Sequence, residues 1–243
     1  MFLSSEALAG WDARHWRRNV AANQSFFGTD ATVLLLIRRP SAWLRSVYQQ
    51  RCHHRGEWLY PHEFFRTADT YDPESLRVQF DLDAFDLAGL IAAYGQAFDR
   101  LVVQKYETIA DGRFLRAALG AGDGLVADFQ HALATTRSNR AFSDRAVKLG
   151  FRLAQAREKL LGRPRVLPPG APHYRSRLDR LFRKAMQLVV DPLLPYRPHV
   201  FDWAEVPGCD IRGLDAAYDA LPDFVLYQDR MPVDLFPDLP KRA

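Results

Sequence analysis

The chain has 243 residues, of which 48% are hydrophobic and 26% are charged. This composition is typical of a folded globular protein with a sizeable core and excludes an intrinsically disordered chain. The formal net charge of +4 suits an anionic ligand but is too small to indicate a nucleic-acid-binding protein.

The N-terminal segment predicts a strand end, a helix and a turn. Residues 1–8 predict a strand end that passes into a loop. A polar helix with two tryptophans is expected from Trp11 to Asn23, and Phe26 to Asp30 form the turn into the next strand.

The stretch from Ala31 to Cys52 organises the chain. The apolar run from Val33 to Ile37 predicts a strand buried on both faces of a parallel sheet. Arg38 and Arg39 follow it, and Pro40 opens a helix. Two guanidinium groups beside a helix N-terminus, at the carboxyl end of a strand, predict a site for a dianion such as phosphate.

A long aromatic loop is predicted from Gly56 to Gln79. Its aromatic side chains either pack locally or stack on a sugar, and we favour packing. The cysteine and histidines around this loop lack the spacing of a zinc site, so no metal is predicted. They are Cys52, His53, His54 and His62.

The clearest helix is expected from Asp83 to Arg100, because its apolar residues recur at helical spacing. A second buried strand, Leu101 to Val103, follows and ends near Tyr106. We expect Asp111 to cap the next helix and Gly120 to end it. Alternating buried strands and amphipathic helices predict an α/β fold with a parallel sheet.

The C-terminal part is predicted to be mostly helical. Helices are expected from Ser143, from Tyr174 to Val190 and from Arg212 to Leu221, with loops elsewhere after Asp191. The basic face of the Tyr174–Val190 helix is either solvated or contacts an anionic lipid or a polyanionic glycan. We expect one domain, with residues 1–134 as the α/β core and 135–243 as the helical part.

The strand followed by Arg38-Arg39-Pro40 and then Ser46-Val47-Tyr48 resembles the 3′-phosphate-binding segment of sulfotransferases that use 3′-phosphoadenosine-5′-phosphosulfate (PAPS). The resemblance extends from Phe2 to about Arg157 and is strongest with bacterial, polysaccharide-type members. It implies a P-loop-like, three-layer parallel sheet and sulfuryl transfer from PAPS to a hydroxyl, most readily that of a carbohydrate.

The resemblance also implies roles for six residues. Arg38 and Ser46 would hold the 3′-phosphate of the donor, and Tyr106 would contact its adenine. Glu6, in a segment similar to L-[IS]-S-x-E-x-L, would be the base that activates the acceptor; a solvated or capping glutamate is the alternative. Asn139 and Arg140 would lie near the nucleotide.

One departure from the family pattern limits these expectations. The glycine-rich K-x-G-[ST]-[ST] loop that holds the 5′-phosphosulfate occurs nowhere in the sequence. We therefore expect an N-terminally truncated member with little transferase activity. A non-catalytic remnant that binds nucleotide or glycan is the alternative.

The expected location is cytoplasmic. No apolar run approaches the length of about 18 residues that a membrane-spanning helix needs. The first residues do not form a secretory signal, and two cysteines provide no disulfide framework.

Overall fold

The computed structural model describes residues 9–55, 58–75, 77–135, 143–161, 197 and 199–229. Within these ranges the chain forms two compact units, each assembled from separated segments. The first contains residues 9–43, 83–135 and 210–229, and the second contains 44–55, 58–75, 77–82, 143–161, 197 and 199–209. The fold is mixed α/β and mainly helical, as the alternation of strands and helices predicts.

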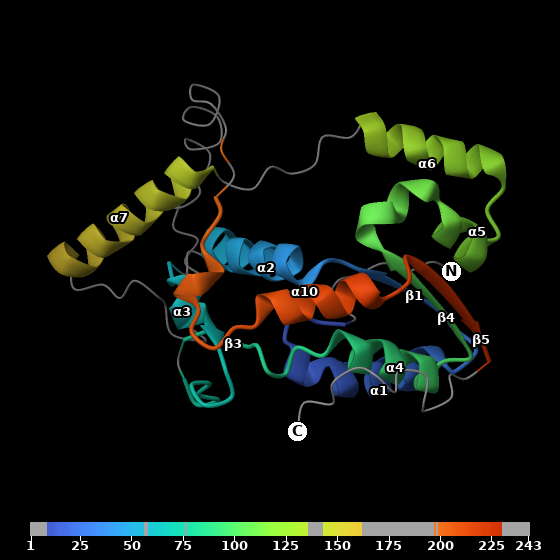
Figure 1. Ribbon diagram of the computed structural model, residues 1–243, viewed down its shortest axis with the longest axis horizontal. Helices are drawn as coiled ribbons and strands as arrows, with labels where there is room; N and C mark the ends of the chain where they lie inside the picture. Colours follow the sequence, from blue (N-terminus) through green and yellow to red (C-terminus); the bar gives the residue numbers. More distant parts are fainter. Residues whose placement is uncertain are drawn as a thin grey trace. The chain divides into compact units, whose positions relative to one another are not determined.

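The first unit is built on a small mixed sheet (Figure 1). Its strands have the order β1-β4-β5. β1 and β4 are parallel, with Ile37 opposite Lys105, whereas β5 is antiparallel to β4. Its elements are η1 (Ala13–His15), α1 (Trp16–Phe27), β1 (Thr32–Ile37), α4 (Leu87–Ala97), β4 (Arg100–Lys105), η2 (Tyr106–Asp111), α5 (Arg113–Leu119), α6 (Asp123–Thr135), α10 (Ile211–Ala220) and β5 (Phe224–Gln228).

The two predicted strands are confirmed and are parallel neighbours in one sheet, but β1, predicted to be buried on both faces, is not the central strand among those described. Among the described strands β4 is central, and Leu101, Val102 and Val103 are at most 3% exposed. β1 is less buried, and Leu36 in it is 44% exposed. The aliphatic side chains of β4 therefore face apolar groups on both sides of the sheet, and each contributes about 1.5–3 kcal/mol when fully buried.

A parallel sheet was predicted. β1 and β4 are parallel, but β5 is antiparallel and makes the sheet mixed. Loops were expected after α10, but Phe224–Gln228 pair with β4. Only residues 221–223 connect α10 to β5, and the Lys105 N–H donates to the Asp223 carbonyl at 2.8 Å, next to this pairing. The four hydrophobic residues from Phe224 to Tyr227 form a short run that is only partly buried, and β5 is an edge strand among the described strands.

Helices cover the sheet of the first unit from two sides (Figure 1). α5 packs Phe114 and Leu115 against Val102, and Gly120 ends this helix in the left-handed conformation, as predicted. α4 is shorter than expected, but its predicted apolar stripe is buried at Leu90, Ile91 and Tyr94. α1 lies beside α4, and the Asn23 amide donates to the Tyr94 hydroxyl at 2.9 Å.

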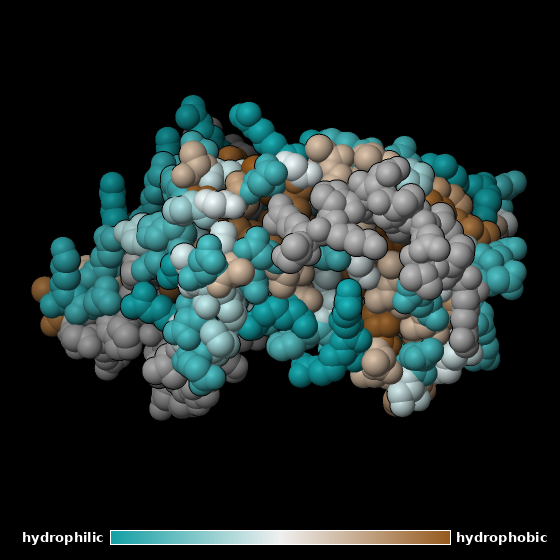
Figure 2. Space-filling view, turned by 60° about the horizontal axis from the view of Figure 1, so that its bottom comes forward, coloured by the Kyte–Doolittle hydropathy of each residue, from teal (hydrophilic) through white to brown (hydrophobic). Residues whose placement is uncertain are grey.

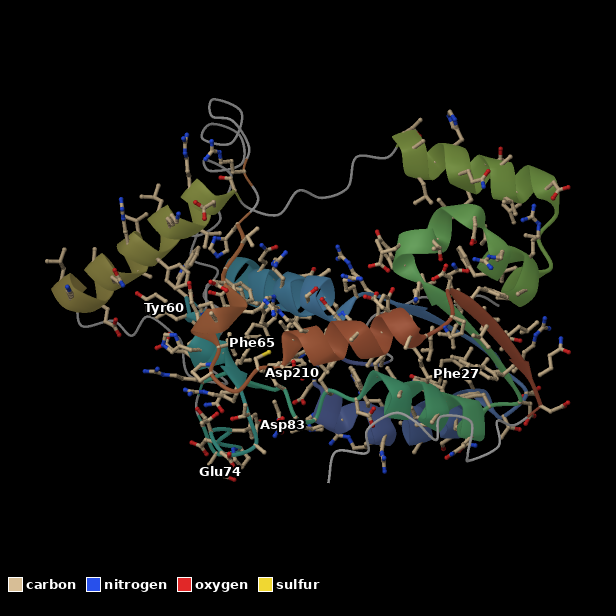
Figure 3. All side chains as sticks on the ribbon, viewed as in Figure 1. Phe27, Tyr60, Phe65, Glu74, Asp83 and Asp210 are labelled. Carbon is tan, nitrogen blue, oxygen red and sulfur yellow. The ribbon has the colours of Figure 1, made fainter. Side chains whose placement is uncertain are left out.

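The second unit has an aromatic core that confirms local packing in the predicted aromatic loop. Phe64, Phe65 and Phe80 are at most 1% exposed, and Tyr48 packs beside them. Figure 3 labels Phe65 and Tyr60 in this unit. Its elements are most of α2 (Pro40–Arg55, which begins in the first unit), α3 (Pro61–Phe64), β2 (Phe65–Arg66), β3 (Phe80–Asp81), α7 (Asp144–Leu161) and η4 (Trp203–Glu205).

α7 confirms the helix predicted from Ser143. The Ser143 hydroxyl accepts a hydrogen bond from the Ala146 N–H at 3.3 Å, and Val147 and Ala154 are buried. Trp58 lies so close to Gly150 that a Cβ there would be 2.1 Å from its ring, so this position requires glycine. The predicted Tyr174–Val190 helix lies outside the described residues. No described helix is long and apolar enough to cross a membrane.

Candidate functional site

The candidate site lies in the first unit, where β1 and β4 end at the same edge of the sheet. Ile37 and Lys105, the last residues of the two strands, are register partners. Arg38 and Tyr106 follow them directly. Parallel strands in α/β proteins place ligand-binding residues at this edge, because the loops that leave all the strands meet there.

Arg38 and Tyr106 are brought together at this edge. The guanidinium carbon of Arg38 lies 5.4 Å from the centre of the Tyr106 ring, a cation–π distance. Both side chains are exposed, with Tyr106 48% accessible. Among the described residues no carboxylate forms an ion pair with Arg38. The pair therefore offers an accessible cation and an accessible aromatic face.

Arg39 has a different environment, because α10 supplies it with a carboxylate. Its Nη2 atom lies 2.6 Å from each carboxylate oxygen of Asp219. The hydrogen bond and the charge of Asp219 raise the pKa of Arg39 above its usual range. Arg39 is therefore already paired, although its side chain is 45% exposed.

The N-terminus of α2 is also occupied by carboxylates of the same unit. The Ser41 N–H donates to Asp215 at 2.9 Å, and the Arg39 N–H donates to Glu107 at 3.3 Å. The next two amides, of Ala42 and Trp43, donate to the Arg39 carbonyl. Carboxylates thus hold the dipole-favoured position where the sequence led us to expect a bound dianion.

Glu107 connects α10 to the ends of β1 and β4. Its Oε2 atom accepts a short hydrogen bond from the hydroxyl of Tyr218, which is 3% exposed. Burial alone would raise the pKa of Glu107, but hydrogen bonds from Tyr218 and from backbone amides, together with the charge of Arg38, hold it below its usual range. Burial and Glu107 together raise the pKa of Tyr218, so its proton stays on the phenol. These contacts give Glu107 a structural role, because it joins α10 to the strand ends.

Lys105 and α10 complete the edge. The helix predicted from Arg212 to Leu221 is confirmed as α10, but a role for it or for Lys105 at this edge was not predicted. Lys105 is 8% exposed, with its Nζ atom 3.2 Å from Asp223 and 4.9 Å from the centre of the Tyr218 ring. Asp210, which Figure 3 labels, is the N-cap of α10, and its carboxylate accepts from the Gly213 N–H at 2.9 Å. No local sequence pattern relates the α10 carboxylates to Lys105, because they lie over a hundred residues apart along the chain.

The charges at this edge restrict what can bind there. Three cations face four carboxylates, so the edge carries no excess positive charge. The cations are Arg38, Arg39 and Lys105, and the carboxylates are those of Glu107, Asp215, Asp219 and Asp223. Arg39 and Lys105 are already paired with carboxylates. Among the described cations of this edge, Arg38 is therefore the one that is available to bind an anionic ligand. The arrangement suits one phosphate group beside a planar ring better than a polyanion.

The other predicted site residues are Ser46, Glu6, Asn139 and Arg140. Ser46 is an exposed residue of α2 and belongs to the second unit. Glu6, Asn139 and Arg140 lie outside the described residues. Their predicted roles therefore stay predictions.

The described residues contain no group of three or more histidine, cysteine, aspartate or glutamate side chains placed to hold a metal ion. Comparison with known proteins provides no relative, since no family profile, curated protein or solved structure matches this chain.

Proposed function

We propose that this protein is a PAPS-dependent sulfotransferase, and that Arg38 binds the 3′-phosphate of the donor at the edge formed by β1 and β4. The observation that carries the proposal is the contact between an exposed arginine, which forms no ion pair with a described residue, and an exposed tyrosine at this edge. The strand, R-x-P turn and helix that hold Arg38 have the order of the family's 3′-phosphate segment. In this proposal the sheet corresponds to part of a P-loop-like, three-layer fold.

Each proposed contact has a chemical task. A guanidinium group forms charge-assisted hydrogen bonds with a phosphate, and its planar fork can engage two oxygens at once. The exposed Tyr106 ring would stack on the adenine. Ser46 would add a hydroxyl to the phosphate. Glu6 would remove the proton from the acceptor hydroxyl as the sulfuryl group arrives.

A first experiment tests nucleotide binding. Isothermal titration of the full chain with adenosine 3′,5′-bisphosphate and with adenosine 5′-monophosphate compares ligands that differ only in the 3′-phosphate. We expect the bisphosphate to bind roughly 10- to 150-fold more tightly, the value of one charge-assisted hydrogen bond. Equal affinities would refute the proposed 3′-phosphate site.

A second experiment tests transfer. Radiolabelled PAPS is incubated with the chain and a panel of polysaccharides, and transfer of the label to the glycan is measured. If Glu6 is the base, Glu6→Gln lowers the rate about 10²–10⁴-fold without changing bisphosphate affinity. An unchanged rate in this variant would assign the base to another residue.

One observation favours a second candidate function, a protein that binds the nucleotide without transferring its sulfuryl group. The sequence lacks the family's glycine-rich phosphosulfate loop, and loss of a single donor to a developing negative charge already costs about 10²–10³-fold in rate. Bisphosphate binding without measurable glycan sulfation would favour this second function. Sulfation that depends on PAPS would favour the enzyme.

A further inference from the structure

α7 presents an unusual exposed surface in the second unit. One side of the helix is fixed by packing: Val147 and Ala146 contact Trp58, and the Phe151 ring stacks on Tyr60 at 5.1 Å. The Gln155 amide donates to the Tyr60 hydroxyl at 2.5 Å on the same side. The rest of the helix surface is therefore turned away from these contacts.

Three leucines form a row on the exposed side. Leu149, Leu153 and Leu160 are 39%, 47% and 81% exposed. At 3.6 residues per turn they fall within an arc of about 40°, on the side of the helix opposite Val147 and Ala154. Exposure of these leucine side chains to water costs about 0.8 kcal/mol for each CH₂ group. Binding of a partner that covers them is therefore favoured.

Four cations form a second row beside the leucines. Arg145, Arg152 and Lys159 are spaced seven residues apart, and Lys148 lies next to them. These cations occupy an arc of about 60° that adjoins the leucine arc. Asp144 pairs with Lys148 at 2.7 Å, whereas the other three cations form no ion pair with a described residue. In Figure 2, hydrophobic and hydrophilic surface lie side by side at the left edge, where Figure 1 places α7.

We propose that the exposed side of α7 binds the surface of an anionic lipid membrane. Helices that lie in a membrane interface bury an apolar face at the acyl boundary and place lysine and arginine at the headgroups. α7 provides both on the same exposed half, over 18 residues or about 27 Å. A nucleic acid would use the cations but leave the leucines in water. A partner helix would cover the leucines but would leave unused the three cations that form no ion pair with a described residue.

The experiment is vesicle cosedimentation of the full chain. Vesicles of phosphatidylcholine with 30% phosphatidylserine are compared with vesicles of phosphatidylcholine alone, at low salt and in 0.5 M NaCl. We expect binding to the anionic vesicles that is lost in high salt, and little binding to neutral vesicles. No binding, or equal binding to both vesicle types, would overturn the proposal.

Variants separate the two rows of side chains. L149S/L153S should reduce vesicle affinity by about tenfold or more, because both leucines leave the acyl boundary. R145Q/R152Q/K159Q should reduce it by about fivefold for each cation neutralised. The matched control is L125S/L133S on α6, where two exposed leucines occur in a helix without lysine or arginine. This control should bind as the unsubstituted chain does, and an equal loss there would overturn the proposal.

A fluorescence measurement keeps the test valid if a serine variant folds poorly. An environment-sensitive dye is attached through Leu153→Cys, in a chain with Cys52 and Cys209 replaced by serine, and its emission should shift to the blue on addition of anionic vesicles. The same dye at Leu133→Cys should show no shift. An unshifted dye at position 153 would contradict insertion. A dimer in light scattering that L149S/L153S dissociates, or RNA binding that this variant retains, would assign α7 to another partner and overturn the proposal.

Discussion

The two arginines that follow β1 are neighbours in the sequence but differ in their surroundings. The side chain of Arg39 is paired with Asp219 of α10, and its backbone N–H donates a hydrogen bond to Glu107 of η2. Arg38 lies over the ring of Tyr106, and no described carboxylate pairs with it. The first arrangement uses a cation to attach a helix to the sheet edge, whereas the second leaves a cation accessible.

The end of β1 can therefore stabilise the fold and bind a ligand at the same time. The carboxylates that attach α10 also neutralise Arg39, Lys105 and the N-terminus of α2. A dianion is therefore not attracted to the edge as a whole, and its binding depends on Arg38. Substitution of Arg39 should therefore change the stability of the fold slightly, whereas substitution of Arg38 should change the affinity for the ligand.

The largest expected effect is on ligand binding at Arg38. Arg38→Ala should weaken adenosine 3′,5′-bisphosphate binding by roughly 10- to 150-fold, because one charge-assisted contact is lost. The free energy of unfolding should change by less than about 0.5 kcal/mol, since an exposed surface position is altered. Calorimetry and urea denaturation measure the two effects. Arg18→Ala, at an exposed position of α1, is the control and should change neither.

The next effect is on stability, at Glu107. Glu107→Ala should lower the free energy of unfolding by about 1–3 kcal/mol, because the buried Tyr218 hydroxyl loses its acceptor. Urea denaturation measures the change. Glu74→Ala removes a carboxylate from an exposed turn of the second unit (Figure 3) and should change stability by less than about 0.5 kcal/mol. Equal effects in the two variants would show that Glu107 does not attach α10.

Arg39→Ala is the matched partner of the first substitution and should have a smaller effect. The ion pair with Asp219 is exposed, with accessibilities of 45% and 51%, and solvent screens such pairs strongly. We expect little loss of stability and a change of bisphosphate affinity well below that of Arg38→Ala. If the two variants lose affinity equally, the distinction between the two arginines is wrong.

The smallest effect concerns pH. The pKa of Glu107 is lowered from its ordinary value of 4.5 in the folded state. Its stabilising contribution is therefore complete above the unfolded-state pKa and is lost as the pH falls through the folded-state pKa. The stability difference between the unsubstituted chain and Glu107→Gln should shrink below about pH 4.5, as measured by urea denaturation at pH 7 and pH 3.5. Asp12 and Asp144, whose pKa values are also lowered, occur in both chains, so their contributions cancel.

Local patterns predicted much of the fold. β1, β4, α4 and α7 follow from apolar periodicity, because each buries one face or a continuous run of side chains. Periodicity did not reveal β5, a short edge strand whose partner β4 lies over a hundred residues away. Periodicity also predicted that β1 is buried on both faces, whereas among the described strands β4 is the central and more buried one.

The candidate site was predictable in one respect and not in another. The R-x-P turn predicted an accessible arginine at the strand end, and Tyr106 was identified at the end of the second strand. Their contact depends on the parallel register of β1 and β4. The attachment of α10 through Asp215 and Asp219 joins residues more than 170 positions apart, and no local pattern reports such a contact.

The most direct test of the central claim is the coupling between Arg38 and the 3′-phosphate. Calorimetry measures the affinity of the unsubstituted chain and of Arg38→Ala for adenosine 3′,5′-bisphosphate and for adenosine 5′-monophosphate. We predict that Arg38→Ala weakens the bisphosphate by roughly 10- to 150-fold and leaves the monophosphate nearly unchanged, so that the two ligands bind the variant alike. An equal loss of affinity for both nucleotides, or no loss for either, would contradict the assignment of Arg38 to the 3′-phosphate.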